Sequence, residues 1–255
     1  MCLTVAYDGS LFHGFQRQPG QRTVQGSLES AIATMAGHPV SVRGAGRTDA
    51  GVHALGQVVA FDTDRTIGER GWQLGLNARL PDDVRVHAAR SCAVAYNPRF
   101  DALAKTYRYV VQLGERKNPL LRHQVWHLGK YGELDLAAVR DACAPLIGTH
   151  DFRAFRAADD KRESTQRTLY SIDLLEGFAG DPSLLAFEVR GTAFMKNMVR
   201  ILVGTLVDVG RGRLCVEDIP NLLGPNAKRE RAGITAPASG LCLVCIELGR
   251  LNARS

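Results

Sequence analysis

Residues 44–53, with the sequence GAGRTDAGVH, contain one carboxylate among an arginine, a threonine and three glycines. That carboxylate, Asp49, is the only acidic side chain from position 30 to position 61. The glycines allow positive φ angles and close backbone approach, and the neighbouring Arg47 favours the ionised form of the carboxyl group. An ionised carboxylate suits a nucleophile better than a general acid. We interpret the stretch as an active-site loop; the alternative is a glycine-rich turn in which Thr48 and Asp49 bond only to their own backbone.

The spacing of the glycines excludes two phosphate-binding motifs. A dinucleotide-binding fingerprint needs a third glycine three residues after the second, and Asp49 occupies that position. A P-loop needs a Gly-Lys-Ser/Thr triplet at the start of a helix, and the sequence contains none. Asp8, in a turn after the first predicted strand, is the second acidic candidate.

Residues 46–53 resemble the signature of the tRNA pseudouridine synthase A family, whose nucleophilic aspartate stands at the position of Asp49. Seven further blocks resemble the family in the same order along the chain: YDGS, GFQRQ, TVQ, NARLP, KTYRY, MVR and TAPASGL. The resemblance therefore covers nearly the whole chain. It implies an enzyme that isomerises uridine to pseudouridine at positions 38–40 of the tRNA anticodon stem-loop, without a cofactor or metal.

The resemblance also implies roles for individual residues. Asp49 is the expected nucleophile, Tyr107 stacks on the extruded base and is a candidate for removing the C5 proton, and Arg200 is the cationic partner of Asp49. The substrate-binding candidates, besides Tyr107, are Arg47, Thr48, Arg17, Gln18, His53, Lys105 and Lys196. Members of the family are homodimers in which one tRNA reaches across both subunits.

The elements that must position Asp49 follow from hydrophobic periodicity. The pattern predicts strands at 3–7, 39–43, 57–61 and 84–88 and helices at 24–35 and 66–78, so that the Asp49 loop connects two strands. This order of strand, helix, strand, strand, helix, strand is that of a ferredoxin-like half with a largely antiparallel sheet.

A second half is predicted after residue 100. Its strands are expected at 105–113, 124–128, 169–175, 184–190 and 241–248, and its helices at 136–146, 194–209 and 216–223. The helix at 194–209 would place Lys196 and Arg200 close together, opposite its apolar face. We therefore predict an α+β protein of two ferredoxin-like or RRM-like halves, residues 1–100 and 101–255. In the family fold they share a largely antiparallel sheet, with helices on one face and the active-site cleft between the halves.

Two further segments combine aromatic and basic residues. Residues 11–22 are predicted to form a loop whose Phe12, Phe15 and Arg17 suit base stacking and phosphate contact, unless the rings anchor the loop to the core. Residues 150–167 form a second charged loop, which either contacts RNA or is simply solvated.

Composition narrows the class of protein. The net charge is +6, and the 32 basic residues comprise 26 arginines and 6 lysines. The excess of arginine over lysine favours a phosphate-bearing partner, although an arginine-rich proteome would show the same excess. The six cysteines are scattered without zinc-binding spacing, so we expect reduced core cysteines and a cytoplasmic location. No apolar run is long enough to span a membrane. Two other functions stay open, a non-catalytic RNA-binding protein and an enzyme acting on small nucleosides.

Overall fold

The computed structural model describes residues 1–129, 134–160 and 162–249 of a mixed α/β protein. The chain divides into two compact units, Met1–Lys105 together with the segment from Cys242 onward, and Thr106–Leu241. This division differs from the predicted halves in the last strand, β10 (Leu241–Leu248), which joins the first unit. The reason is its parallel pairing with β3 (His53–Ala60), where Cys242 faces His53 and Leu243 faces Ala54.

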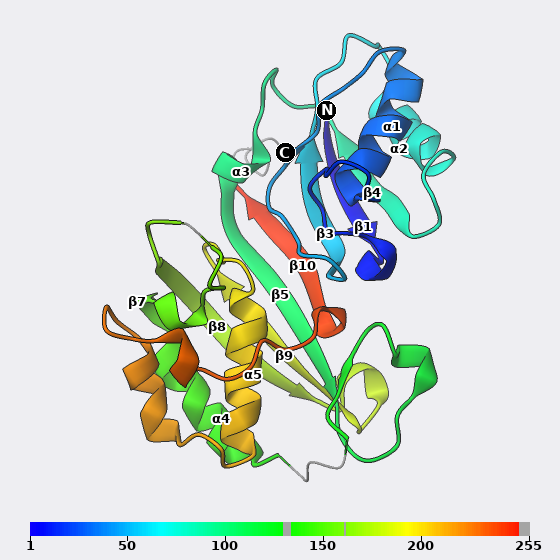
Figure 1. The fold of residues 1–255 in the computed structure, drawn as a ribbon. Coiled ribbons are helices and arrows are strands. Elements are labelled where there is room, and N and C mark those ends of the chain that lie inside the picture. Colours follow the sequence, from blue (N-terminus) through cyan, green and yellow to red (C-terminus); the bar gives the residue numbers. More distant parts are fainter. Residues whose placement is uncertain (130–133, 161, 250–255) are drawn as a thin grey trace. The chain divides into compact units, whose positions relative to one another are not determined.

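The first unit contains strands in the order β4-β1-β3-β10. β1 (Cys2–Tyr7) pairs antiparallel with both β3 and β4 (Val84–Arg90), which confirms the largely antiparallel sheet. Helices α1 (Val24–Ala36) and α2 (Glu69–Asn77) lie on the same side of these strands (Figure 1).

The first helix begins and ends where the sequence predicts. The Thr23 side chain accepts a hydrogen bond from the Gly26 amide at the start of α1, and Gly37 ends the helix in the left-handed conformation with φ of 81°. Leu28 and Ile32, one turn apart, are fully buried and form the apolar stripe that joins the helix to the core.

The strand predicted at 39–43 is largely wrong. Only β2 (Arg43–Gly44) pairs with β3, because the Val42 amide donates instead to the carboxylate of Glu29 in α1, at 3.1 Å. β3 begins at His53, four residues before the predicted start at residue 57. The start of β3 pairs with β10, a strand almost 200 residues away, which local periodicity does not show.

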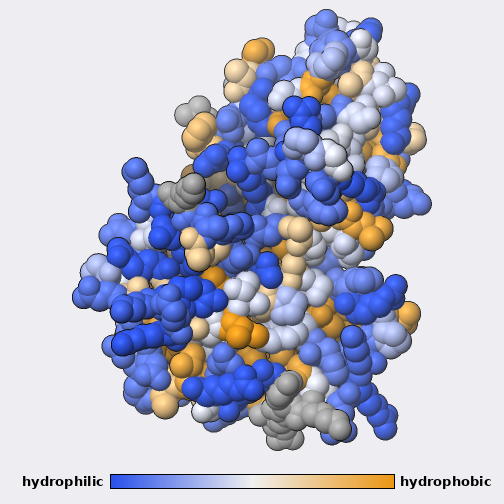
Figure 2. Space-filling model, viewed as in Figure 1, coloured by the Kyte–Doolittle hydropathy of each residue, from blue (hydrophilic) through white to orange (hydrophobic). Residues whose placement is uncertain are grey.

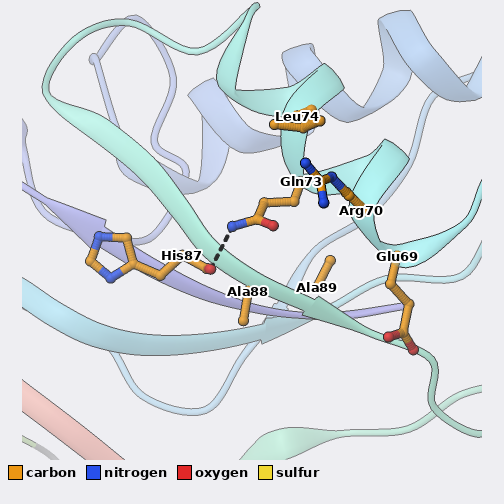
Figure 3. Close-up of a pocket in the computed structure, with 7 residues that line it drawn as sticks. All are labelled: Glu69, Arg70, Gln73, Leu74, His87, Ala88 and Ala89. Atoms are coloured by element: carbon orange, nitrogen blue, oxygen red, sulfur yellow. Dashed lines mark hydrogen bonds between the residues drawn. The ribbon is translucent and has the colours of Figure 1, made fainter.

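Side chains of α2 bond to the backbone of the edge strand β4, as Figure 3 shows for Gln73. The Asn77 side chain accepts a bond from the Val86 amide at 2.8 Å and donates to the Val86 carbonyl oxygen at 2.9 Å, as a neighbouring strand would. One turn earlier, Gln73 donates to the carbonyl oxygen of His87 at 2.6 Å. These amides satisfy backbone groups that would otherwise be open to pairing with another chain.

The second unit contains strands in the order β5-β9-β8-β7. β5 (Ala102–Gln112) begins in the first unit and continues into the second, and the short β6 (Trp126–His127) runs parallel to it. β8 (Gln166–Glu176) and β9 (Leu184–Gly191) form a hairpin from the strands predicted at 169–175 and 184–190, and β7 (Gly148–Asp151) pairs antiparallel with β8. Helices α4 (Leu136–Cys143) and α5 (Met198–Gly210) lie on one face of β8 and β9 (Figure 1).

Short helices connect these elements. The α-helical turn α3 (Pro98–Asp101) precedes β5. The 3₁₀ turns are η1 (Gly9–Leu11), η2 (Pro119–Leu121), η3 (Ala144–Leu146), η4 (Arg153–Phe155), η5 (Phe178–Gly180), η6 (Val216–Leu222), η7 (Arg229–Arg231) and η8 (Ala238–Gly240). The helix predicted at 216–223 is therefore the 3₁₀ segment η6.

Two predictions in the second unit are corrected. The helix predicted from residue 194 begins only at Met198, because Asn197 adopts a left-handed conformation with φ of 61°; Lys196 consequently lies outside the helix. The charged loop predicted at 150–167 contains β7 and η4, and its Phe152 and Phe155 are fully buried with ring centroids 5.9 Å apart. These rings belong to the core and do not face RNA.

The face of the molecule seen in Figure 2 is largely polar. In Figure 2, hydrophilic residues cover most of the face shown and apolar residues form separate small patches. None of the helices in the described residues has the length and apolar character needed to cross a membrane. Burial raises the pKa of the Cys2 and Cys143 thiols to about 12, as expected for core cysteines, whereas Cys215 is exposed.

Candidate active site

The loop that carries Asp49 connects β2 to β3 in the first unit. Asp49 begins a turn in which the Val52 amide donates to the Asp49 carbonyl oxygen at 3.1 Å. Gly51 adopts φ of 79° in this turn, a conformation that favours glycine. The Asp49 side chain is half-buried, and within the described residues its carboxylate accepts no hydrogen bond.

Buried polar side chains hold this loop from β1 and β3. The Tyr7 hydroxyl lies 2.8 Å from the Thr48 hydroxyl, and Gln57, which is 0% exposed, donates from its side chain to the Gly46 carbonyl oxygen at 3.0 Å. Burial raises the pKa of Tyr7 to about 12, so its hydroxyl keeps its proton at neutral pH. Thr48, a predicted substrate-binding residue, is buried in this contact directly before Asp49.

The loop at residues 11–22 holds the Asp49 loop from a second direction. The Phe15 amide donates to the Thr48 carbonyl oxygen at 3.0 Å, and the Gly51 amide donates to the Phe12 carbonyl oxygen at 3.3 Å. Phe12 and Phe15 are each 3% exposed, so both rings anchor the loop to the core and are not platforms for bases. The two loops therefore form one hydrogen-bonded assembly around Asp49.

Arg17 and Gln18 lie on the exposed part of the same loop. The Arg17 guanidinium is 3.3 Å from Glu29, and 72% of its side chain remains exposed. Gln18 donates from its side chain to the His13 carbonyl oxygen at 2.9 Å. Arg47 is also exposed, and in the part of the chain that the structure describes it makes no hydrogen bond or ion pair.

Lys105 and His53 bond to backbone groups of the Asp49 loop or close to it. The Lys105 ammonium donates to the Ala45 carbonyl oxygen at 2.9 Å. His53 Nδ1 accepts a bond from the Gly9 amide at 3.1 Å and lies equally close to an Asp8 carboxylate oxygen.

Tyr107 lies in the second unit, on β5. Its ring is buried and meets the Phe194 ring edge-on, with centroids 5.1 Å apart and an interplanar angle of 78°. Two positions along the strand, the Tyr109 hydroxyl donates to the Pro237 carbonyl oxygen at 2.7 Å, and burial raises the pKa of Tyr109.

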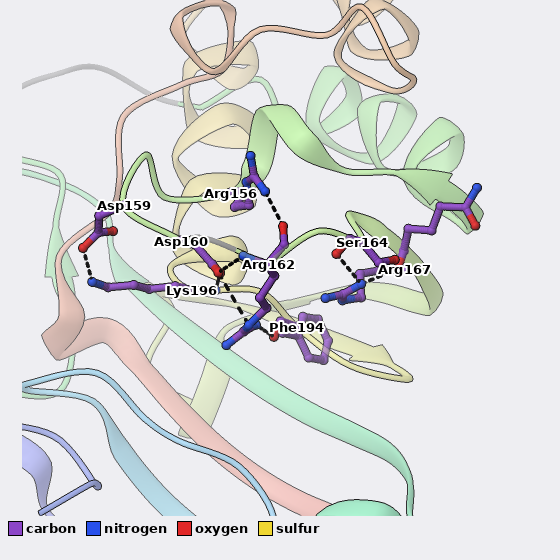
Figure 4. A network of polar contacts seen from close by, with 9 residues as sticks. Arg156, Asp159, Asp160, Arg162, Ser164, Arg167, Phe194 and Lys196 are labelled. Atoms are coloured by element: carbon purple, nitrogen blue, oxygen red, sulfur yellow. Dashed lines mark hydrogen bonds and ion pairs between the residues drawn. The ribbon is translucent and has the colours of Figure 1, made fainter.

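Arg200, also in the second unit, is oriented by the chain that follows α5 and by the residue before it. Its Nε donates to the Ala236 carbonyl oxygen at 2.6 Å, and Nη1 donates to the Asn197 side chain at 2.9 Å. Two backbone carbonyl groups of the TAPASGL block (residues 235–241) therefore accept hydrogen bonds, one from Arg200 and one from Tyr109. Lys196 pairs with Asp159 at 2.5 Å (Figure 4).

Comparison with known proteins identifies the family. A family model described as tRNA pseudouridine synthase matches residues 3–101 and 142–247. A tRNA pseudouridine synthase A from Geobacter sp. (strain M21) is 45% identical over 95% of this chain and 96% of its own length. Proteins of the same name from Solidesulfovibrio magneticus and Bacillus velezensis are 47% and 43% identical, over 97% and 96% of this chain and 90% and 98% of their own lengths. The chain belongs to the tRNA pseudouridine synthase A family.

Membership of the tRNA pseudouridine synthase A family decides between the open functions. The reaction of the family is the isomerisation of uridine in tRNA, which favours an enzyme over a non-catalytic RNA-binding protein and tRNA over a free nucleoside. Within the described residues, no group of three or more His, Cys, Asp or Glu side chains could hold a metal ion.

Three residues that contact the Asp49 loop or a predicted site residue were not among the site residues predicted from the sequence. Gln57 carried a usable signal, since an amide inside the apolar run of a strand needs a buried partner. Gly14 was visible only as the first residue of the GFQRQ block, and Phe194 carried no signal, because their importance comes from contacts with Thr48 and Tyr107, which are far away in sequence.

Proposed function

We propose that this chain isomerises uridine to pseudouridine at positions 38–40 of the tRNA anticodon stem-loop, with Asp49 as the nucleophile. Tyr107 stacks on the extruded uracil and is the candidate for removing the C5 proton. Arg200 is the cationic partner that favours the ionised form of the aspartate. The resemblance of the surrounding blocks to the family supports these roles.

The reaction balances without any added group. The bond from ribose C1′ to uracil N1 breaks, the uracil rotates, and a bond forms from C1′ to C5. The proton on C5 leaves and N1 gains one, so the product is an isomer of the substrate and no cofactor is required. The protein must supply a carboxylate at the departing centre and a group that moves the proton from C5.

The observation that carries the proposal is the way the Asp49 loop is held. Tyr7, Gln57 and the Phe15 amide hold Gly46 and Thr48, before Asp49, and the Phe12 carbonyl oxygen holds the Gly51 amide after it. The Asp49 carboxylate itself accepts no hydrogen bond from the described residues. A turn residue that bonded only to its own backbone would need none of these long-range contacts. A fixed backbone with an uncommitted carboxylate is the arrangement that a preorganised nucleophile requires.

The substrate and the assembly follow from the same resemblance. Extruding a base costs a few kcal/mol and costs least near the end of a loop, which suits an anticodon stem-loop. The exposed guanidinium groups of Arg17 and Arg47 suit contact with phosphate. We further propose a cytoplasmic homodimer in which one tRNA reaches across both subunits.

The test is incubation of the pure protein with unmodified tRNA, without cofactor, followed by mapping of pseudouridine. The Asp49→Asn variant is expected to form none while retaining tRNA binding, because the amide keeps the shape of the side chain and loses its charge. Asp8→Asn, which makes the same change in the second acidic candidate, is the control and is expected to remain active. Full activity of Asp49→Asn would remove the central assignment, and product outside positions 38–40 would remove the assigned substrate.

A further inference from the structure

Residues 194–197, here called the 194–197 segment, lie between β9 and α5 and contact both candidate catalytic residues of the second unit. At one end, the Phe194 ring packs edge-on against Tyr107. At the other end, the Asn197 side chain accepts a hydrogen bond from Arg200 at 2.9 Å. A shift of this segment would therefore move the supports of Tyr107 and Arg200 together.

The segment has no regular secondary structure, and its backbone groups bond to residues near the end of η4 (Figure 4). The Lys196 amide donates to the Asp160 carboxylate at 3.0 Å, and the Lys196 carbonyl oxygen accepts from the Ala157 amide at 3.2 Å. The Phe194 carbonyl oxygen accepts from the Arg162 guanidinium at 3.0 Å. These three bonds connect the backbone of the segment to residues 157–162.

Asp160 is the centre of this arrangement. Its side chain is only 6% exposed, and it also accepts the Arg162 amide at 3.2 Å and lies 3.6 Å from the Arg162 guanidinium. Burial by itself would raise the pKa of this carboxyl group, but the amides of Lys196 and Arg162 and the nearby guanidinium groups lower it further than burial raises it. The carboxylate is therefore ionised at neutral pH and bonds to the segment in that form.

We propose that Asp160 is a positioning residue for uridine isomerisation, which holds the 194–197 segment and, through it, Tyr107 and Arg200. This inference rests on the proposed roles of those two residues. Asp160 itself touches neither of the reacting groups in the proposed mechanism, so its effect reaches the reaction only through the segment.

The neighbouring carboxylate provides a matched control. Asp159 pairs with the Lys196 ammonium instead of the Lys196 amide, and 69% of its side chain is exposed. Removing the charge of Asp159 changes the net charge by the same amount at the next position but breaks no bond to the backbone of the segment. Comparing the Asp160 and Asp159 variants therefore distinguishes an effect on the position of the segment from an effect of the changed local charge.

The experiment compares Asp160→Ala, Asp160→Asn and Asp159→Asn by kcat and KM for unmodified tRNA. We expect Asp160→Ala to lower kcat by about tenfold or more with KM changed less than threefold, because a displaced catalytic group slows the chemical step. Asp160→Asn is expected to recover most of this loss, since its amide oxygen can still accept the Lys196 amide. Asp159→Asn should keep the wild-type kcat.

Circular dichroism fixes a temperature at which every variant is folded, and Asp160→Asn provides the comparison if the alanine variant does not fold. A double variant with Phe194→Leu tests the route, since the two changes should be less than additive if Asp160 acts through that ring. The inference is overturned if Asp160→Ala loses stability but keeps its kcat, if Asp160→Ala and Asp159→Asn lose kcat equally, or if KM alone changes. Failure of the proposed function would appear separately, as wild-type rates in Tyr107→Phe and Arg200→Met.

Discussion

Gly14 offers a direct test of how the loop at residues 11–22 fixes the Asp49 loop. Its φ is +86°, and a Cβ built there would lie 2.9 Å from the Thr48 carbonyl oxygen and 3.3 Å from the Asp49 carbonyl carbon. Both neighbours are backbone atoms, so they cannot rotate out of the way. The Gly14→Ala substitution must therefore displace the backbone at Asp49 or the loop itself.

Two costs contribute to the expected loss. A non-glycine residue in a left-handed conformation costs about 1–2 kcal/mol. Inserting a methyl group into a filled space costs about 1–3 kcal/mol more, so Gly14→Ala should lower the free energy of unfolding by about 2–5 kcal/mol. A displacement of a few tenths of an ångström at Asp49 should also lower kcat by about tenfold, since a 1 Å misplacement can cost about a hundredfold.

Gly20→Ala is the control in the same loop. Gly20 has φ of +69°, and no heavy atom of the described structure lies within 4 Å of a Cβ built there, so only the backbone cost of about 1–2 kcal/mol applies. Unfolding in urea measures the stabilities, and pseudouridine formation in unmodified tRNA measures kcat. Equal stability and equal kcat in the two variants would refute the argument that contact between the loops positions Asp49.

Two further predictions concern side-chain hydrogen bonds. Thr48→Val should lower the free energy of unfolding by about 1–3 kcal/mol, because it removes the 2.8 Å partner of the buried Tyr7 hydroxyl. Adding Tyr7→Phe should restore part of that loss in urea unfolding, and strictly additive losses would contradict the pairing. Burial by itself would raise the pKa of Asp151, but hydrogen bonds from Arg153 and Thr165 lower this pKa below the value of about 3.9 that an aspartate has in an unfolded chain. The ionised Asp151 therefore stabilises the folded state above about pH 4, and this stabilisation is lost as the pH falls through the lowered pKa. The stability difference between the wild type and Asp151→Asn should therefore shrink as the pH falls below about 4 in unfolding experiments across pH 3–7, and a difference independent of pH would contradict this.

Local sequence signals determined much of the fold. The Thr23 cap, the stripe of Leu28 and Ile32 and the Gly37 stop predict α1 because each acts within a turn or two of its own position. The alternation of apolar and polar residues likewise predicts the strands β1, β4, β8 and β9. β8 pairs with β9, which is the next strand along the chain. The isolated carboxylate at Asp49 among glycines was equally visible, since both the charge and the flexible backbone are properties of that stretch alone.

Tertiary structure decided what depends on partners far away in sequence. β3 begins at His53 because β10 pairs with it. α5 begins late because Asn197, the last residue of the 194–197 segment, is left-handed, and the preceding Lys196 amide bonds to Asp160. Phe152 and Phe155 are in the core although their neighbours are charged. Composition and periodicity describe what each residue favours in its own segment. Which buried donor meets which acceptor depends on the path of the whole chain, and those pairings fix the backbone around Asp49 and orient Arg200.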